Sequence, residues 1–235
     1  MQKKLQIIQK QFNKFHDNIK LSPKDNQILR EKRDKLAEEF QEWLDSNWDK
    51  LYPNTKKPTF DTFNQGSYAM GTGIKASKAE DHDIDVGFMF NIDKDDFKPE
   101  EVKNWVATAL TKGGRIIVWK YPCIRVQYTE KGELSHHVDI TCYAAPDYNN
   151  KKTYLAKAQN NTYPKKLRIW EETDPKSLTS LFKESEEGED KKQRQRVLRG
   201  LKRWKDYNFN ADNGRPIGIA LTACALDWFQ AYGET

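Results

Sequence analysis

Asp83 and Asp85 are separated by one residue, and this pair is the first feature of the sequence that could do chemistry. In a strand, the two side chains would share one face, with their α-carbons roughly 7 Å apart. Carboxylates at that spacing can hold two magnesium ions, which lie about 3.5–4 Å apart in two-metal sites. An isolated Asp-x-Asp pair is more often simply solvated, so the metal interpretation depends on its neighbours.

Two further motifs favour a phosphate-transfer site. The tripeptide Gln-Gly-Ser at 65–67 follows a predicted strand over 59–63, and such a turn can offer backbone N–H groups and a hydroxyl to phosphate oxygens. Asp139 alternates with apolar residues in a predicted strand over 134–143, where a third carboxylate could complete the metal site. Gly-Ser, Asp-x-Asp and a later Asp form a stronger signal together than any one of them alone.

The segments that must position these residues change from helical to extended patterns and back. Residues 1–52 predict long N-terminal helices, because apolar residues recur every three or four positions. Residues 53–150 predict a mixed sheet of short strands with one amphipathic helix. Residues 151–235 predict a C-terminal helical region. The expected fold class is therefore α/β (α+β), with an α/β centre between two helical parts.

A basic helix predicted over 193–207 is rich in Arg and Lys. Its apolar residues Val197, Leu201 and Trp204 are expected to face inward. This would leave the charges in solvent, which is the usual state of such a run. Phosphate binding is the sharper alternative, and we assign it to Lys202 alone.

Composition excludes several classes of protein. The 235 residues include 40 Lys and Arg against 35 Asp and Glu, and a net charge of +5 is too small to indicate nucleic-acid binding. No apolar run approaches the roughly 20 residues of a membrane span, and the N-terminus lacks the apolar stretch of a signal peptide. The three cysteines are far apart, which predicts a reducing cytoplasm and no structural zinc.

The order Gly66-Ser67, Asp83-x-Asp85 and Asp139 resembles the DNA polymerase beta-like nucleotidyltransferases. Within that superfamily the chain is similar to the bacterial CD-NTases, relatives of cyclic GMP-AMP synthase and oligoadenylate synthase. The second resemblance rests on the long N-terminal helices and on the runs DITCYAAP from 139, LKRWK from 201 and GIALT from 218. It implies a nucleotidyltransferase core over 53–150. Family members usually continue into more C-terminal helix, so the region 151–235 is expected to be incomplete.

The resemblance implies an enzyme that joins nucleoside triphosphates, releases pyrophosphate and makes a cyclic di- or trinucleotide second messenger in anti-phage defence. Two Mg²⁺ ions, which Mn²⁺ can replace, would be held by the catalytic residues Asp83, Asp85 and Asp139. The donor nucleotide, ATP or another triphosphate, would be bound by Gln65, Gly66, Ser67 and Lys202. A serine often stands at the position of Gly218, so this chain lacks one expected hydroxyl contact.

Clustered carboxylates add nothing to folding, so the loss of any one aspartate is expected to leave stability unchanged or slightly raised. Two other functions stay open. The first is a polymerase beta-like transferase that acts on RNA or protein, and the second is a non-catalytic nucleic-acid-binding module that uses the basic helix. We expect no required nucleic acid and no membrane, with control by a regulatory protein partner or by expression.

Overall fold

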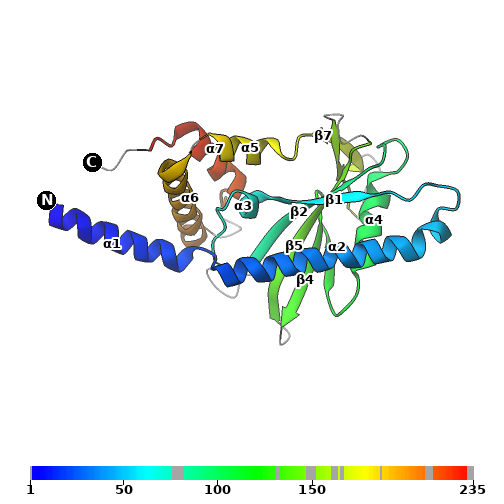
Figure 1. The fold of residues 1–235 in the computed structure, drawn as a ribbon, viewed down its shortest axis with the longest axis horizontal. Helices are drawn as coiled ribbons and strands as arrows, with labels where there is room; N and C mark the ends of the chain where they lie inside the picture. The colour runs from blue at the N-terminus through cyan, green and yellow to red at the C-terminus, as the bar shows by residue number, and fades with distance from the viewer. Residues whose placement is uncertain are drawn as a thin grey trace. The chain divides into compact units, whose positions relative to one another are not determined.

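The computed structural model describes residues 2–75, 82–130, 133–146, 152–159, 164, 167–185, 187–209 and 214–231, but not the side chains at 2–5, 82, 83, 130 and 133–135. The chain forms two compact units. The helical unit comprises Met1–Asn26, Gly66–Lys78 and Ser177–Thr235, and the sheet unit comprises Gln27–Gln65 and Ala79–Lys176. The colours of Figure 1 allow the interleaved segments to be followed along the chain.

The sheet unit contains a mixed sheet, as the sequence predicts. Its described strands are β1 (Phe60–Gln65), β2 (His82–Phe90), β3 (Ile116–Trp119), β4 (Ile124–Glu130), β5 (Glu133–Ala144), β6 (Thr153–Lys157) and β7 (Ile169–Thr173). The strand order is β1-β2-β5-β4-β3, while β6 pairs with β5 and β7 pairs with β6. The strands β2 and β5 run parallel, and the other pairs are antiparallel.

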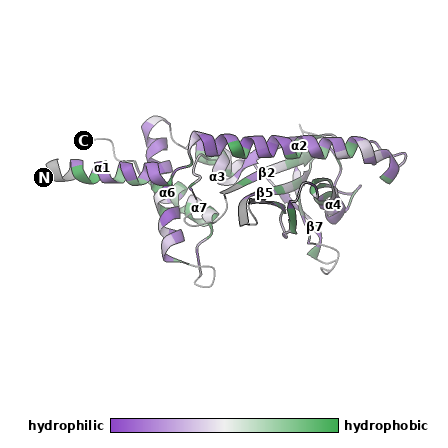
Figure 2. Ribbon diagram, turned by 90° about the horizontal axis from the view of Figure 1, so that it is seen from below, coloured by the Kyte–Doolittle hydropathy of each residue, from purple (hydrophilic) through white to green (hydrophobic). Residues whose placement is uncertain are grey.

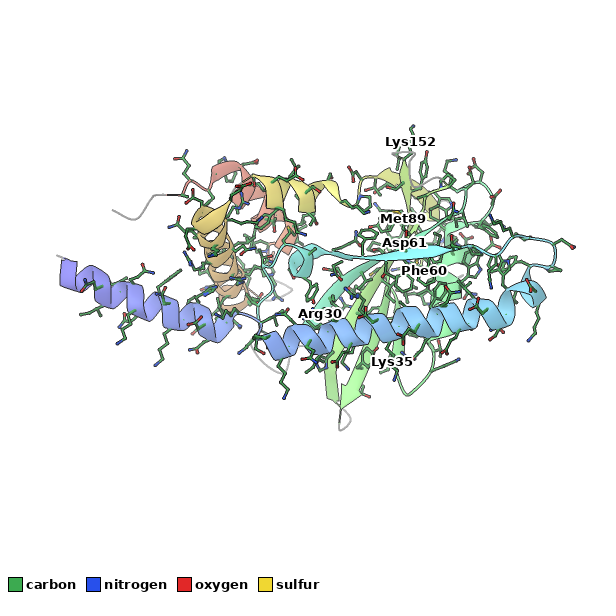
Figure 3. All side chains as sticks on the ribbon, in the orientation of Figure 1. Arg30, Lys35, Phe60, Asp61, Met89 and Lys152 are labelled. Atoms are coloured by element: carbon green, nitrogen blue, oxygen red, sulfur yellow. The ribbon has the colours of Figure 1, made fainter. Side chains whose placement is uncertain are left out.

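One face of the sheet carries the main apolar core beneath two helices, α2 (Pro23–Leu51), which enters the sheet unit at Gln27, and α4 (Pro99–Leu110). The buried residues of α2 recur at helical spacing and are Leu29, Leu36, Phe40, Leu44 and Trp48. The Phe40 ring lies 5.0 Å from the Phe60 ring and 5.6 Å from the Phe90 ring. Figure 3 shows Phe60 on the side of β1 that faces α2. These contacts fix β1 and β2 against α2.

A buried lysine fastens α4 to the loops at the end of the sheet. Lys103 donates hydrogen bonds to the carbonyl oxygens of Lys120 at 2.5 Å and Tyr121 at 3.0 Å, and to that of Ala158. Burial lowers the pKa of the Lys103 ammonium to about 8. One side chain therefore joins the turn between β3 and β4 to the end of β6.

The opposite face of the sheet carries a smaller apolar cluster of Phe63, Met89, Tyr143, Ala145 and Leu155. Side chains alternate between the faces along each strand. The same face therefore also receives Gln65, two positions after Phe63, Asp85, four positions before Met89, and Asp139, four positions before Tyr143. This is the face on which the predicted carboxylates lie.

The helical unit is formed around short helices packed on a basic one. Its described helices are α1 (Gln2–Ile19), α3 (Gly66–Ala69), α5 (Ser177–Glu184), α6 (Gly188–Asn208) and α7 (Gly218–Trp228). Its buried core consists of Met70, Phe182, Leu198 and Ala225. The core is small, because α3, α5 and α7 each contribute few apolar side chains.

The inward face of α6 differs from the expected one. Leu201 and Trp204 are 37% and 50% exposed, whereas the buried residues are Arg194, Leu198 and Lys202, spaced four apart. The cations can be buried because each finds acceptors: Arg194 donates to the hydroxyl of Ser185 at 2.6 Å, for example. The expectation that the basic side chains lie in solvent was therefore wrong for this face.

Two strands lie in the region 151–235 that was expected to be helical. β6 and β7 are each five residues long and pair with each other, so they continue the sheet from β5. Runs this short carry too few repeats for a helical period to be told from an extended one. The compact units also cut across the expected division at 52 and 150, because α2 packs on the sheet whereas α1 belongs to the helical unit.

Most of α1 is exposed within its unit. Ile8, Phe12 and Phe15 of its apolar stripe are 56%, 40% and 39% exposed, and Ile19 at its end is buried. Apolar and polar residues follow one another along α1 in Figure 2. Across the residues that the structure describes, none of the helices combines the length and apolar character that a membrane span needs.

Candidate active site

Four polar residues form a row across neighbouring strands of the sheet. Gln65 on β1 pairs with Asp85 on β2, Asp85 pairs with Asp139 on β5, and Asp139 pairs with Arg125 on β4. Directly paired residues place their side chains on the same face of a sheet. The sheet thus brings together three of the predicted site residues, Gln65, Asp85 and Asp139, although they are far apart in sequence.

Apolar neighbours hold the two carboxylates on this face. Ile84, Val86, Val138 and Ile140 flank Asp85 and Asp139 in sequence, and all four are essentially buried in the main core. Because they occupy the opposite face, alternation directs the aspartates away from the core. Asp85 and Asp139 lie on adjacent strands, which are separated by about 4.8 Å. Two carboxylates this close form an oxygen donor set of the kind that Mg²⁺ prefers.

The third predicted carboxylate falls outside the described side chains. The backbone of Asp83 lies in β2 and pairs with His137, but its side chain is not described. Among the side chains that are described, no group of three or more His, Cys, Asp and Glu is placed to hold a metal ion. Asp85 and Asp139 fit a divalent cation by their chemistry and register, and Asp83 stays a predicted ligand.

Arg125 is a member of the row that the sequence analysis did not single out. Its Nε and Nη2 donate to the two carboxylate oxygens of Asp139, each at 2.7 Å, in a bidentate pair. Each carboxylate oxygen has a second lone pair, so this pairing leaves Asp139 able to accept from a further group. An Arg between the apolar Ile124 and Val126 was the signal, because it places a cation on the polar face of a strand.

The predicted phosphate residues lie in the helical unit, around Thr72. The backbone of Gly66 has φ +57°, a left-handed conformation that favours glycine. The N–H of Thr72 donates to the Ser67 carbonyl at 2.8 Å. Lys202, which is 8% exposed, donates from Nζ to the hydroxyl and carbonyl of Thr72 at 3.1 and 3.2 Å. Ser67 and Lys202 therefore share Thr72 as a neighbour.

One face of α6 holds the loop that follows Ser67. Gln195 donates to the Met70 carbonyl at 2.8 Å, Arg199 donates to the Gly71 carbonyl, and Arg203 donates to the Lys75 carbonyl at 2.5 Å. With Lys202, these side chains supply donors to carbonyls that the loop leaves without helical or strand partners. The positive charge of this face therefore acts first on the protein's own backbone.

Comparison with known protein families identifies the segment that contains Asp85 and Asp139. Residues 58–143 match the family described as cyclic GMP-AMP synthase DncV-like, nucleotidyltransferase domain. This match confirms, for that segment, the resemblance expected from the motifs. The comparison with curated proteins gives no match.

Solved structures of DncV enzymes share the fold. Vibrio cholerae DncV cyclic AMP-GMP synthase superposes with a TM-score of 0.72 at 18% identity, covering 92% of this chain and 71% of that chain. The same synthase in complex with nonhydrolyzable GTP gives 0.73 at 18% identity over 92% and 70% of the two chains. Escherichia coli DncV bound to 3'-deoxy GTP gives 0.69 at 19% identity over 92% and 71%. The predicted fold class is confirmed as the DncV nucleotidyltransferase fold.

Proposed function

We propose that this chain is a metal-dependent nucleotidyltransferase of the cytoplasm that joins nucleoside triphosphates into a cyclic di- or trinucleotide messenger for anti-phage defence. The observation that carries the proposal is the direct pairing of Asp85 with Asp139 on one polar face, within the segment that matches a nucleotidyltransferase domain. The DncV structures support the same reading, since V. cholerae DncV is described with the linear intermediate 5' pppA(3',5')pG.

In this proposal Asp83, Asp85 and Asp139 hold two Mg²⁺ ions, which Mn²⁺ can replace. When bound, such ions favour ionisation of an acceptor hydroxyl and neutralise charge on a leaving pyrophosphate. Asp85, which pairs with Asp139 and follows Asp83 by two residues, would help to hold both ions. Asp139, oriented by Arg125, is assigned to receive the proton of the acceptor hydroxyl.

The donor triphosphate is assigned to residues of the helical unit. Gly66 and Ser67 offer backbone N–H groups and a hydroxyl, and Lys202 offers its ammonium beside the same loop. Because Lys202 is held by Thr72, its side chain is preorganised and loses little freedom when a phosphate binds. The backbone of the 70–75 loop is kept in shape by the other donors of α6.

The alternative functions receive less support. A nucleic-acid-binding module would need the cations of α6 to face a phosphate backbone, yet Arg199 and Arg203 donate to loop carbonyls. A transferase that acts on RNA or protein would use the same carboxylates. It is therefore separated from the main proposal by its product and not by the residues of the site.

The test is to incubate the protein with labelled nucleoside triphosphates and Mg²⁺ in the absence of any template. We expect small, phosphatase-resistant products, and we expect Asp85→Asn to lower turnover by at least about 1,000-fold, as the loss of a central catalytic group does. Asp61→Asn is the matched control, because Asp61 is an exposed carboxylate on β1 whose position is labelled in Figure 3. Labelled polymer or protein would support the alternative transferase, and full activity of Asp85→Asn would overturn the metal site.

A further inference from the structure

Both ends of the Gln65 amide are bonded within the sheet. Thr141 Oγ1 donates to Gln65 Oε1 at 2.5 Å, and Gln65 Nε2 donates to Tyr143 Oη at 2.8 Å. Tyr143 is 4% exposed, and burial raises the pKa of its hydroxyl, so it remains protonated at neutral pH. We call these three linked side chains, Gln65, Thr141 and Tyr143, the amide clamp.

The amide clamp joins two strands that do not pair with each other. Because β2 lies between β1 and β5, Gln65 must reach across β2 to contact β5. The register places Gly87 on β2 between Phe63 and Thr141. A Cβ at Gly87 would collide with the Phe63 ring, so the glycine leaves room for side chains that cross the strand.

The clamp is anchored on the same strands as the carboxylates. Thr141 and Tyr143 follow Asp139 by two and four residues on β5, and all three alternate onto one face. Gln65 is the register partner of Asp85 and the last residue before Gly66. The clamp thus connects the strand that carries Asp139 with the residue paired to Asp85.

We propose that Gln65 is a positioning residue for the transfer reaction: through Thr141 and Tyr143 it keeps the end of β1 and the strand β5 in one fixed arrangement. This inference rests on the proposed function. It is offered in place of the direct nucleotide contact expected for Gln65, because the two hydrogen bonds of the amide hold it against β5. Small errors in the placement of reacting groups reduce turnover strongly, which gives such a clamp its value.

The experiment compares two single variants with their double variant. Gln65→Met removes the amide at similar size, and Tyr143→Phe removes only the hydroxyl at the far end. We expect each to lower kcat by about 10–100-fold while the KM for the nucleoside triphosphate changes by less than about twofold. The double variant should be no worse than the poorer single one, because both changes break the same connection.

Tyr52→Phe is the matched control. It also removes a tyrosine hydroxyl with one hydrogen bond, from Trp105 Nε1 at 2.9 Å, within the same unit but at the core helices. It should lower the unfolding midpoint to a similar degree and keep the parental kcat. If Tyr52→Phe loses as much kcat as Tyr143→Phe, the lower kcat reflects a general loss of stability, and the positioning role is wrong.

The remaining outcomes separate the two proposals. If Gln65→Met weakens nucleotide binding while Tyr143→Phe behaves as the parent, Gln65 contacts the nucleotide directly and the clamp role is wrong. If the parent makes no product from any mixture of triphosphates, the proposed function fails and takes the catalytic role of Gln65 with it. Urea unfolding tests the clamp independently of activity. If the losses of unfolding free energy in the Gln65 and Tyr143 variants add up in the double variant, the two side chains are not coupled and the clamp is wrong.

Discussion

At the scale of single residues, Asp139 shows how a partner changes what a side chain does for stability. The sequence predicts that the loss of any clustered aspartate leaves stability unchanged or slightly raised. The structure gives Asp139 a bidentate guanidinium partner, and both side chains are mostly covered, with 15% of Asp139 and 22% of Arg125 exposed. For Asp139 the expectation has to be corrected, because its removal leaves a partly buried cation without this acceptor.

Asp139→Ala is therefore expected to lower the free energy of unfolding by about 1–3 kcal/mol, in the range measured for hydrogen bonds to charged groups. Urea unfolding at neutral pH measures the effect. The double variant Asp139→Ala/Arg125→Met should recover part of the loss, because it also removes the guanidinium that has lost its Asp139 acceptor. Equal stability of parent and Asp139→Ala would show that the ion pair contributes nothing to folding.

Gly87 is a second position where one atom matters. A methyl group there would collide with the Phe63 ring, so Gly87→Ala is expected to destabilise the protein by about 1–3 kcal/mol through overpacking. Phe63→Leu in the same chain should restore part of the loss, since a smaller side chain leaves room for the methyl. Thermal unfolding of the two single variants and the double variant measures the coupling free energy between positions 63 and 87. A Gly87→Ala protein as stable as the parent would show that the methyl group fits without a collision.

At the scale of elements, local patterns predicted the strands near the site well. Alternation of apolar residues around Asp85 and Asp139 located β2 and β5 and the face that carries the aspartates. The inward face of α6 was not predictable in this way, because its buried Arg194 and Lys202 depend on carbonyl acceptors from distant segments. Arg125 was missed for the same reason. A periodic pattern reports which residues are apolar, but it does not report which polar groups have partners.

The attachment of α1 to α6 predicts a dependence on pH. Arg199 Nη1 lies 2.7 Å from His16 Nε2, and since a guanidinium can only donate, the imidazole must accept and be neutral. Burial and then the charge of Arg199 and Lys20 lower the pKa of His16 below 6.5, against a smaller opposing effect of Asp17. The unfolded chain thus binds a proton more readily than the folded one.

It follows that this contribution to stability is fully present above about pH 6.5 and is lost as the pH falls through the lower folded pKa. Urea unfolding between about pH 5 and 7.5 should show the decline in the parent. His16→Gln should show a smaller decline, because glutamine can still accept from Arg199 but does not titrate in this range. Parallel curves for the two proteins would exclude His16 as the source.

At the scale of the whole molecule, the division into units could not be read from the sequence. The helical unit is assembled from three separate segments and the sheet unit from two. Changes in composition along the chain can mark domains that are continuous in sequence. They do not show that a later segment, such as 177–235, packs with a segment much earlier in the chain. The predicted division into consecutive parts therefore differs from the compact units, although the predicted mixed sheet between helices is present.

The overall charge leads to a prediction about activation. With a net charge of +5, and with several cations of α6 bonded to loop carbonyls, the chain offers little for a long nucleic-acid duplex to neutralise. We expect product formation at about 0.15 M salt to change by less than about twofold when double-stranded DNA or RNA is added. A large stimulation that disappears at higher salt would instead identify the protein as a nucleic-acid sensor.

The parallel pairing of β2 with β5 also leads us to expect an order of folding events. Forty-two residues lie between the two strands, and closing so long a segment is slow compared with forming hairpins such as β4–β5. We therefore expect Asp85 and Asp139 to become neighbours only in a late step of folding. During synthesis, a nascent chain that has not yet exposed β5 therefore has no complete row of site residues, and in refolding the recovery of catalysis should follow the slowest phase. Any activity that needs both carboxylates would therefore appear only after the sheet has closed.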